Sequence, residues 1–414
     1  MGHGIELRKY PYPYRCAVAL SNDAEYMTPT AFWDLHQLLD RLELEVTDSA
    51  FMYSTSRARS FSYFRGTEAE PSAQAGWMRD AMRAGLIDTL HSWGDFDEGG
   101  FCRAHALRAA EELTREGLRP AVWTHHGCAA NTQNLGGPQD EYQRGDLPDA
   151  AEYHADLTLA LGVEFFALDA DDVCLPGHDS DWSLRLVWRE ARREPRLRAL
   201  RDRLRRGRLL GTERLRDGRL VRTFRRYRGP WRPDVRTLAR QLAPPRLDHL
   251  AESAGCMVVY QHLGCDRNAS GCCRPNRPPY FDPPGLRTLE DLSARHLTGQ
   301  VWVTGLHRLL RYRAVQEGLR WSWRARGGGV EVVISGVEDP IRGRWQPGEA
   351  DLEGVTFLCP QPARTEVWLE GQGSPTRLAV RRHALPGGAG ALVVPWRRLE
   401  LPPRPSAATL EREP

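Results

Sequence analysis

Residues that can bind a metal ion or transfer a proton follow five short, mostly apolar runs of this 414-residue chain. Carboxylates and imidazoles are the oxygen and nitrogen ligands of divalent metals, and the same groups act as general bases and acids. Each run is followed along the chain by polar residues: 16–20 by Asn22 and Asp23, 87–90 by His91 and Asp95, 121–124 by His125 and His126, 163–168 by Asp169 and Asp171, and 257–261 by His262.

The elements that must position these residues alternate along the chain. Amphipathic segments at 30–42, 74–83, 102–115 and 150–161 separate the apolar runs, and this alternation is typical of a parallel β/α architecture. Apolar runs without a polar alternation indicate strands that are buried on both faces. Because the carboxyl ends of barrel strands meet at one rim, we expect Asp23, His91, Asp95, His126 and His262 to gather at a common mouth.

The pattern changes along the chain and predicts three further segments. The arginine-rich stretch at about 180–230 is interpreted as an insertion, with a helix at 186–206 and a hairpin at Asp217-Gly218. A solvated helix face is the favoured interpretation there, and a basic arm for an anionic glycan is the alternative. Short strand-like segments between Gly/Pro turns predict a small β-sandwich at 319–401, and 402–414 is expected to be a disordered tail.

Composition excludes several classes of protein. The 57 Lys and Arg against 54 Asp and Glu leave a net charge of +3, too small to indicate a nucleic-acid partner. No apolar run approaches the length of a membrane span, and the polar N-terminus predicts no secretory signal, so a cytoplasmic protein is expected. The odd count of nine cysteines argues against a disulfide framework, and a zinc site at Cys265, Cys272 and Cys273 is the less favoured alternative for that cluster.

Three motifs resemble a known family. Ala19-Leu-Ser-Asn-Asp23, His91-Ser-x-x-Asp95 and Val258-Val-Tyr-Gln-His262 resemble motifs one, two and five of the NodB-homology polysaccharide deacetylases, within the glycoside hydrolase/deacetylase superfamily. The resemblance covers about 14–315 and looks closer to a branch associated with bacterial surface-polysaccharide gene clusters. It implies a distorted (β/α)7 barrel for 1–318, a divalent metal, and hydrolysis of the N-acetyl group of an amino sugar in a polysaccharide or glycoconjugate.

The family's motifs carry over to this chain with changes. Motif one of the family has two adjacent aspartates, a base and a metal ligand, whereas only Asp23 stands here, and Glu25 offers a replacement carboxylate. Asp95 takes the place of a motif-two histidine. From the spacing we expect a metal site of Asp23, His91, Asp95 and His126, with zinc as the first choice and iron, nickel or cobalt as alternatives. Asp23 as base or ligand and His262 as general acid complete the predicted catalytic residues.

A wider set of rim residues is predicted to contact the carbohydrate substrate. Aromatic side chains suit stacking on sugar rings, although buried aromatics are commoner, and a strand-end Asp equally often caps a helix. The predicted substrate-binding residues are Asn22, Glu25, Trp93, Trp123, Asn134, Asp169 and Asp171.

Two other functions remain open at this point. A glycosidase-like enzyme would use paired carboxylates, such as Asp23 and Asp171, and would need no metal. A barrel without catalytic activity would bind glycan or act as a scaffold, and the missing motif-one carboxylate favours it. Metal analysis of the purified protein separates these alternatives from the metal-dependent hydrolase.

Overall fold

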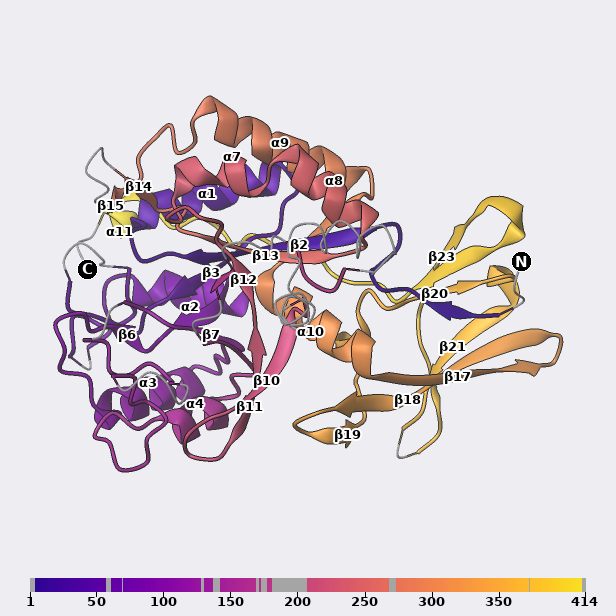
Figure 1. The fold of residues 1–414 in the computed structure, drawn as a ribbon, viewed down its shortest axis with the longest axis horizontal. Helices are drawn as coiled ribbons and strands as arrows, with labels where there is room; N and C mark the ends of the chain where they lie inside the picture. The colour runs from indigo at the N-terminus through magenta and orange to yellow at the C-terminus, as the bar shows by residue number, and fades with distance from the viewer. Residues whose placement is uncertain are drawn as a thin grey trace, which may run out of the picture.

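The computed structural model describes residues 4–56, 61–68, 70–127, 130–136, 142–168, 171–172 (backbone only), 177–180, 207–267, 273–371 and 373–411. A mixed α/β part holds most of the chain, and a group of strands formed by the later residues extends from one side of it (Figure 1).

The α/β part is built on one large sheet. Nine of its strands are parallel to their neighbours, in the order β11-β8-β7-β5-β3-β2-β13-β12-β9. Two more strands join it: β10 is antiparallel to β11, and β16 is parallel to β2. The bounds are β2 (Cys16–Asp23), β3 (Thr47–Ala50), β5 (Ile87–His91), β7 (Val122–Thr124), β8 (Phe165–Ala167), β9 (Asp171–Asp172), β10 (Leu210–Arg214), β11 (Leu220–Phe224), β12 (Arg226–Tyr227), β13 (Cys256–Gln261) and β16 (Val301–Val303).

This sheet is strongly curled. β11 and β12 lie near opposite ends of the strand order, yet Arg225 is the one residue between them in the chain. The curl therefore brings the two ends of the sheet close together. The predicted α/β class is confirmed as a half-barrel sheet accompanied by further small sheets, whereas a complete (β/α)7 barrel is not confirmed.

Helices pack on the outside of the curled sheet, with α1, α7, α8 and α9 along one side and α2, α3 and α4 along another (Figure 1). Thr28 caps the first helix by accepting a hydrogen bond from the backbone of Ala31, and Pro29 opens it. The helix expected at 150–161 begins only at Ala155, and the residues before it lie in turns such as the one closed by the Tyr153 N–H and the Ala150 carbonyl. The bounds are α1 (Pro29–Arg41), α2 (Ala75–Arg83), α3 (Arg103–Arg115), α4 (Ala155–Leu161), α7 (Leu238–Gln241), α8 (Pro244–Glu252), α9 (Pro283–Leu297) and α10 (Leu306–Gly318).

Part of the arginine-rich stretch belongs to the main sheet. The predicted hairpin at Asp217-Gly218 is present between β10 and β11, but β11 also pairs with β8. Val221, Phe224 and Tyr227 are buried, so 207–227 completes the sheet instead of standing apart as an insertion. The predicted helix at 186–206 lies outside the described residues.

The later strands form two small sheets that share a core. Their orders are β1-β20-β24-β23 and β17-β18-β21-β22, with β19 on β18. Trp321 of β17 contacts Phe357 of β20 at 5.0 Å between ring centres, so the sheets face one another. The bounds are β1 (Glu6–Leu7), β17 (Leu319–Arg326), β18 (Gly329–Asp339), β19 (Gly343–Trp345), β20 (Thr356–Cys359), β21 (Thr365–Leu369), β22 (Thr376–Arg377), β23 (Arg381–Ala384) and β24 (Gly390–Val393).

The remaining elements are short and lie in the connections. Two of them form the hairpin β14 (Cys265–Arg267) and β15 (Cys273–Pro275), and two more form the pair β4 (Tyr53–Ser54) and β6 (Gly94–Asp95). The single-turn helices are η2 (Val235–Thr237), η3 (Ala350–Leu352), η4 (Pro362–Arg364) and η5 (Pro386–Gly388).

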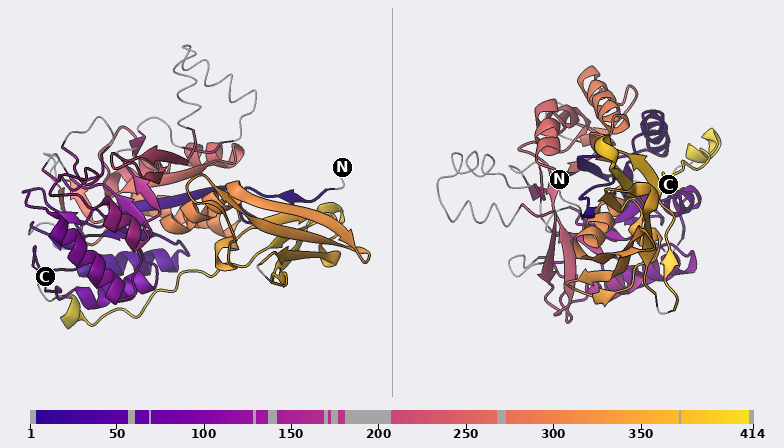
Figure 2. Two further views of the ribbon diagram at one scale, coloured as in Figure 1. Left: turned by 90° about the horizontal axis from the view of Figure 1, so that it is seen from below. Right: turned by 90° about the vertical axis from the view of Figure 1, so that its right-hand side faces the viewer.

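The C-terminal segment runs back from the small sheets along the α/β part (Figure 2). A disordered tail was expected from 402, but Arg404 pairs with Asp34 of α1 at 2.7 Å and Leu410 of α11 (Ala407–Leu410) is buried. An ion pair and one buried leucine hold this polar segment on the surface of α1. None of the described helices is both long and apolar enough to cross a bilayer.

Candidate functional site

The predicted rim residues converge at the carboxyl ends of the sheet strands. Asp23 ends β2, His91 ends β5, and His126 and His262 follow β7 and β13. Asp23 Oδ2 lies 3.5 Å from His91 Nε2 and 3.7 Å from His262 Nε2. Parallel strands place their carboxyl ends at one edge, so residues up to 240 positions apart in the chain meet here.

His126 stands at the centre of this cluster. Its Nδ1 lies 3.1 Å from both Glu25 Oε2 and His91 Nε2, and its Nε2 lies 3.4 Å from Asp95 Oδ1 and 3.7 Å from Asp97 Oδ1. Ligands about 2.0–2.1 Å from a tetrahedral metal are separated from one another by about 3.3–3.4 Å. The donor atoms around His126 are therefore spaced as metal ligands are.

Within the described part of the chain, two groups of three residues offer such donors, and they share His126. One is Glu25, His91 and His126, and the other is Asp95, Asp97 and His126. The first differs from the expected set because Glu25, which we assigned to the substrate, takes the ligand position next to His91. Asp97 was missed, although the pattern Asp95-Phe96-Asp97 puts both carboxylates on one side of an extended segment.

Hydrogen bonds to neighbouring residues orient His91 and His126. His91 Nδ1 lies 2.9 Å from Thr124 Oγ1, so a metal on Nε2 would leave the Nδ1 proton to be donated to that hydroxyl. His126 is held by its backbone: Asn134 Nδ2 donates to the His126 carbonyl at 2.9 Å, and Ser92 Oγ accepts from the His126 N–H at 3.1 Å. Asn134, predicted to bind substrate, thus supports the loop that carries His126.

A buried arginine faces Asp23. Arg226 of β12 lies 3.3 Å from Asp23 Oδ2, and its guanidinium stacks on the ring of Tyr260, 3.8 Å from the ring centre. Ser49 Oγ donates to Asp23 Oδ1 at 3.2 Å. Sequence reasoning missed Arg226 because it lies in the arginine-rich stretch; its position between the apolar Phe224 and Tyr227 was the available signal.

Burial and charge set the protonation of the site. Burial raises the pKa of Asp23, but His91 and Arg226 outweigh it and hold that pKa well below its usual range. Burial likewise opposes the charge of Glu25, yet His126 lowers the Glu25 pKa to about 2. For His126 burial favours the neutral ring, but Glu25 and Asp95 raise its pKa to about 9. Without a metal, His126 therefore carries the positive charge between these carboxylates at neutral pH.

His91 behaves in the opposite way to His126. Its burial dominates and lowers its pKa to about 4, against the attraction of Asp23. A neutral imidazole is the form that binds a metal. The site thus presents ionised carboxylates and the neutral His91 to an incoming cation, whereas His126 must release its proton before it can bind one.

His262 also lies beside Asp23 and Glu25. Its Nε2 is 3.5 Å from Glu25 Oε1 and 3.1 Å from the hydroxyl of Tyr260. Its Nδ1 is buried and has no hydrogen-bond partner among the described residues. His262 therefore lies beside the carboxylates and outside both candidate ligand groups.

Three of the residues predicted to contact substrate are engaged within the fold, namely Asn22, Trp93 and Trp123. The amide of Asn22 is used within the fold: Nδ2 donates to Asp48, and Oδ1 accepts from the backbone of Leu263 at 2.7 Å. Trp93 and Trp123 are fully buried and contact each other edge to face, so neither offers a surface for a sugar ring. Asp169 lies outside the described residues, and for Asp171 the structure describes the backbone in β9 alone.

The cysteine cluster is no zinc site in this structure. Cys265 and Cys273 form a disulfide across the β14–β15 hairpin, which leaves neither as a thiolate ligand. Cys272 lies outside the described residues.

Comparison with models of known protein families, with curated proteins and with solved structures found no match to this chain. The geometry of the site therefore carries the functional argument.

Proposed function

We propose that this protein is a divalent-metal-dependent hydrolase that removes the N-acetyl group of an amino sugar in a polysaccharide or glycoconjugate. The observation that carries the reaction type is the buried cluster around His126, in which carboxylates and imidazoles lie at ligand spacing. That the substrate is an N-acetylated sugar is inferred from the resemblance of three motifs to the NodB-homology deacetylases. The same resemblance implies that the half-barrel sheet described above is part of a distorted (β/α)7 barrel.

The donor set fits a divalent metal. Glu25, His91 and His126 would hold it, with zinc as the first choice and iron, nickel or cobalt as alternatives, because these metals accept mixed nitrogen and oxygen ligands. When bound, the metal supplies a Lewis acid for the amide carbonyl and lowers the pKa of water.

The chain's own residues supply the proton transfers. Asp23 accepts a proton from the attacking water, and Arg226 and Ser49 hold its carboxylate in a fixed orientation. His262, whose Nε2 lies 3.7 Å from Asp23 Oδ2, donates a proton to the departing amine. Asp95 and Asp97 lie near Nε2 of His126 and stabilise a proton on that nitrogen, whereas Glu25 faces Nδ1.

The test combines metal content with acetate release. The full-length protein is purified, its metals are measured by mass spectrometry, and acetate is assayed on N-acetylglucosamine oligomers before and after treatment with a chelator. We expect about one divalent ion per chain, activity that is lost with the chelator, and recovery when zinc, cobalt, nickel or ferrous iron is restored.

Matched variants separate ligand loss from general damage. Glu25→Gln and His91→Ala should lose both metal and activity, and Asp23→Asn should lose activity with metal retained. His383→Ala, at an exposed position on β23, is the control and should retain both. Full acetate release by Asp23→Asn and His91→Ala, or by the metal-free protein, would refute the proposal.

A further inference from the structure

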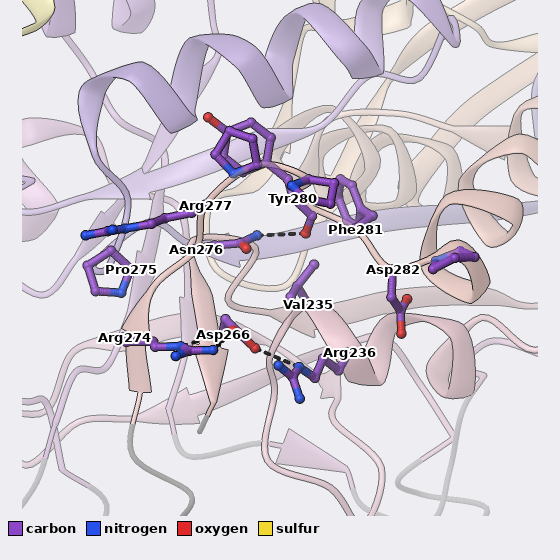
Figure 3. A pocket seen from close by; sticks show the side chains of 13 residues that line it. Val235, Arg236, Asp266, Arg274, Pro275, Asn276, Arg277, Tyr280, Phe281 and Asp282 are labelled. Atoms are coloured by element: carbon purple, nitrogen blue, oxygen red, sulfur yellow. Dashed lines mark hydrogen bonds and ion pairs between the residues drawn. The ribbon is translucent and has the colours of Figure 1, made fainter. Parts of the chain in front are cut away.

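A second polar feature is a pocket of about 880 Å³ between the β14–β15 hairpin, η2 and the start of α9 (Figure 3). This volume is within the range of pockets that bind small ligands. Three arginines line it, Arg236, Arg274 and Arg277, together with the carboxylates of Asp266 and Asp282.

The arginines are arranged around one carboxylate. Figure 3 shows Asp266 between Arg274 and Arg236. Arg236 Nε lies 2.7 Å from Asp266 Oδ1, and Arg274 NH2 lies 2.7 Å from Asp266 Oδ2. Two guanidinium groups from different elements are thus held side by side with one negative charge between them. Both arginine side chains are more than half exposed, so their remaining N–H groups are accessible.

The other polar groups of the wall are already engaged. Asp282 caps α9 by accepting from the backbone of Gly285 at 2.8 Å. Asn276 Nδ2 donates to the carbonyls of Leu263 and Tyr280. Arg277, in contrast, has no hydrogen bond or ion pair with any described residue. The donors left for a ligand are therefore guanidinium N–H groups, which match the oxygens of a phosphate.

The pocket is tied to the catalytic cluster by a short connection. Asp266 is four residues beyond His262, so the two residues are at most about 14 Å apart. Asn276 braces this connection through the carbonyls of Leu263 and Gly264, and the Cys265–Cys273 disulfide joins the two strands that carry Asp266 and Arg274. A ligand bound at both places would be held in a fixed position relative to His262.

We propose that Arg236, Arg274 and Arg277 form a binding site for a phosphate group, and that this phosphate belongs to the substrate. The second half of this statement rests on the proposed function, and it names the substrate class: an N-acetylated amino sugar that carries a phosphate ester, as in a nucleotide-linked or lipid-linked sugar. Tyr280 and the neighbouring prolines provide an apolar wall beside the arginines for the rest of such a ligand.

Binding is measured by calorimetry on the full-length protein with three probes: inorganic phosphate, UDP-N-acetylglucosamine and N-acetylglucosamine. Glucuronate, a sugar that carries a carboxylate and no phosphate, is titrated as a fourth probe. We expect both phosphate-bearing probes to bind, and Arg274→Gln and Arg277→Gln each to weaken that binding by about tenfold, since each removes a charge-assisted hydrogen bond. Arg320→Gln is the matched control, because Arg320 is equally exposed, has one ion pair at 3.2 Å, and lies on β17.

The outcomes are distinguishable from those of the hydrolase test. Each titration is repeated with a chelator, and phosphate binding that survives the chelator supports the arginine pocket whether or not the protein is a hydrolase. Binding that disappears with the chelator places the phosphate on a metal and overturns the inference. Equal binding by Arg274→Gln, Arg277→Gln and Arg320→Gln overturns it too, and so does a protein that binds glucuronate but neither phosphate probe.

Discussion

The charge on His126 gives a quantitative prediction for the metal-free protein. Glu25 and Asp95 raise the pKa of this histidine from 6.5 to about 9 in the folded state. At 1.36 kcal/mol per pKa unit, the protonated ring contributes about 3 kcal/mol of stability. Because the folded pKa is the higher one, this contribution is complete below pH 6.5 and is lost as the pH rises through 9.

The assay is chemical denaturation in the presence of a chelator at pH 6, 7.5 and 9.5, for the wild type and for His126→Gln. The free energy of unfolding of the wild type should exceed that of the variant by about 3 kcal/mol more at pH 6 than at pH 9.5. His383→Gln, an exposed substitution, should follow the wild type throughout. A constant gap between the wild type and His126→Gln would refute the idea that a protonated His126 bridges the carboxylates.

Metal binding must displace the same proton, so the apparent metal affinity should rise by about tenfold per pH unit between pH 6.5 and 9. A competition titration with a chromogenic chelator measures this slope. A flat profile over that interval would contradict the assignment of His126 as a ligand.

Three further predictions concern Asn134 and Arg226 at the site and Asp88 near the start of β5. Asn134→Ala removes the support of the His126 loop, so metal affinity should fall by about 10–100-fold in the same competition titration. Arg226→Gln removes the guanidinium that pairs with the buried Asp23 and should lower the free energy of unfolding by about 3–5 kcal/mol, with part of the loss restored in the double variant Arg226→Gln/Asp23→Asn. An unchanged denaturation midpoint would contradict the ion pair. Burial raises the pKa of Asp88 from 3.8 to about 6, so the wild type loses stability as the pH rises across that interval. Between pH 3.5 and 7, the free energy of unfolding of Asp88→Asn, measured by denaturation, should therefore rise by about 3 kcal/mol relative to that of the wild type. Parallel pH profiles of the two proteins would contradict this prediction.

Part of the site was predictable because it depends only on the local pattern of residues along the chain. A buried parallel strand followed by a polar residue puts that residue at the carboxyl edge of the sheet, and this argument located Asp23, His91, His126 and His262. The same argument could not tell a ligand from a support. Asn134 has the polar side chain of a binding residue, but its amide is used to hold the His126 loop.

The errors have a common physical cause. Trp93 and Trp123 lie beside rim residues in the sequence, but the aromatic rings point into the core and contact each other. Arg226 lies in a stretch whose composition indicates a solvated surface, but β12 carries it to Asp23. Composition and periodicity describe the average environment of an element. The environment of an individual side chain can differ from that average, because it depends on which other elements pack against it.

The amino-acid sequence by itself determined five of the sheet strands, several of the helices between them, the parallel architecture and the edge at which the polar residues lie, because these follow from hydrophobic period and from residues that start or stop elements. Only the tertiary structure decided that Glu25 and Asp97 face His126, that Arg226 pairs with Asp23, and that Arg236, Arg274 and Arg277 share one pocket. Such contacts join elements that are far apart in the sequence, and their distance in space depends on how the sheet curls and how its connections pack, which is set by the packing of the whole core.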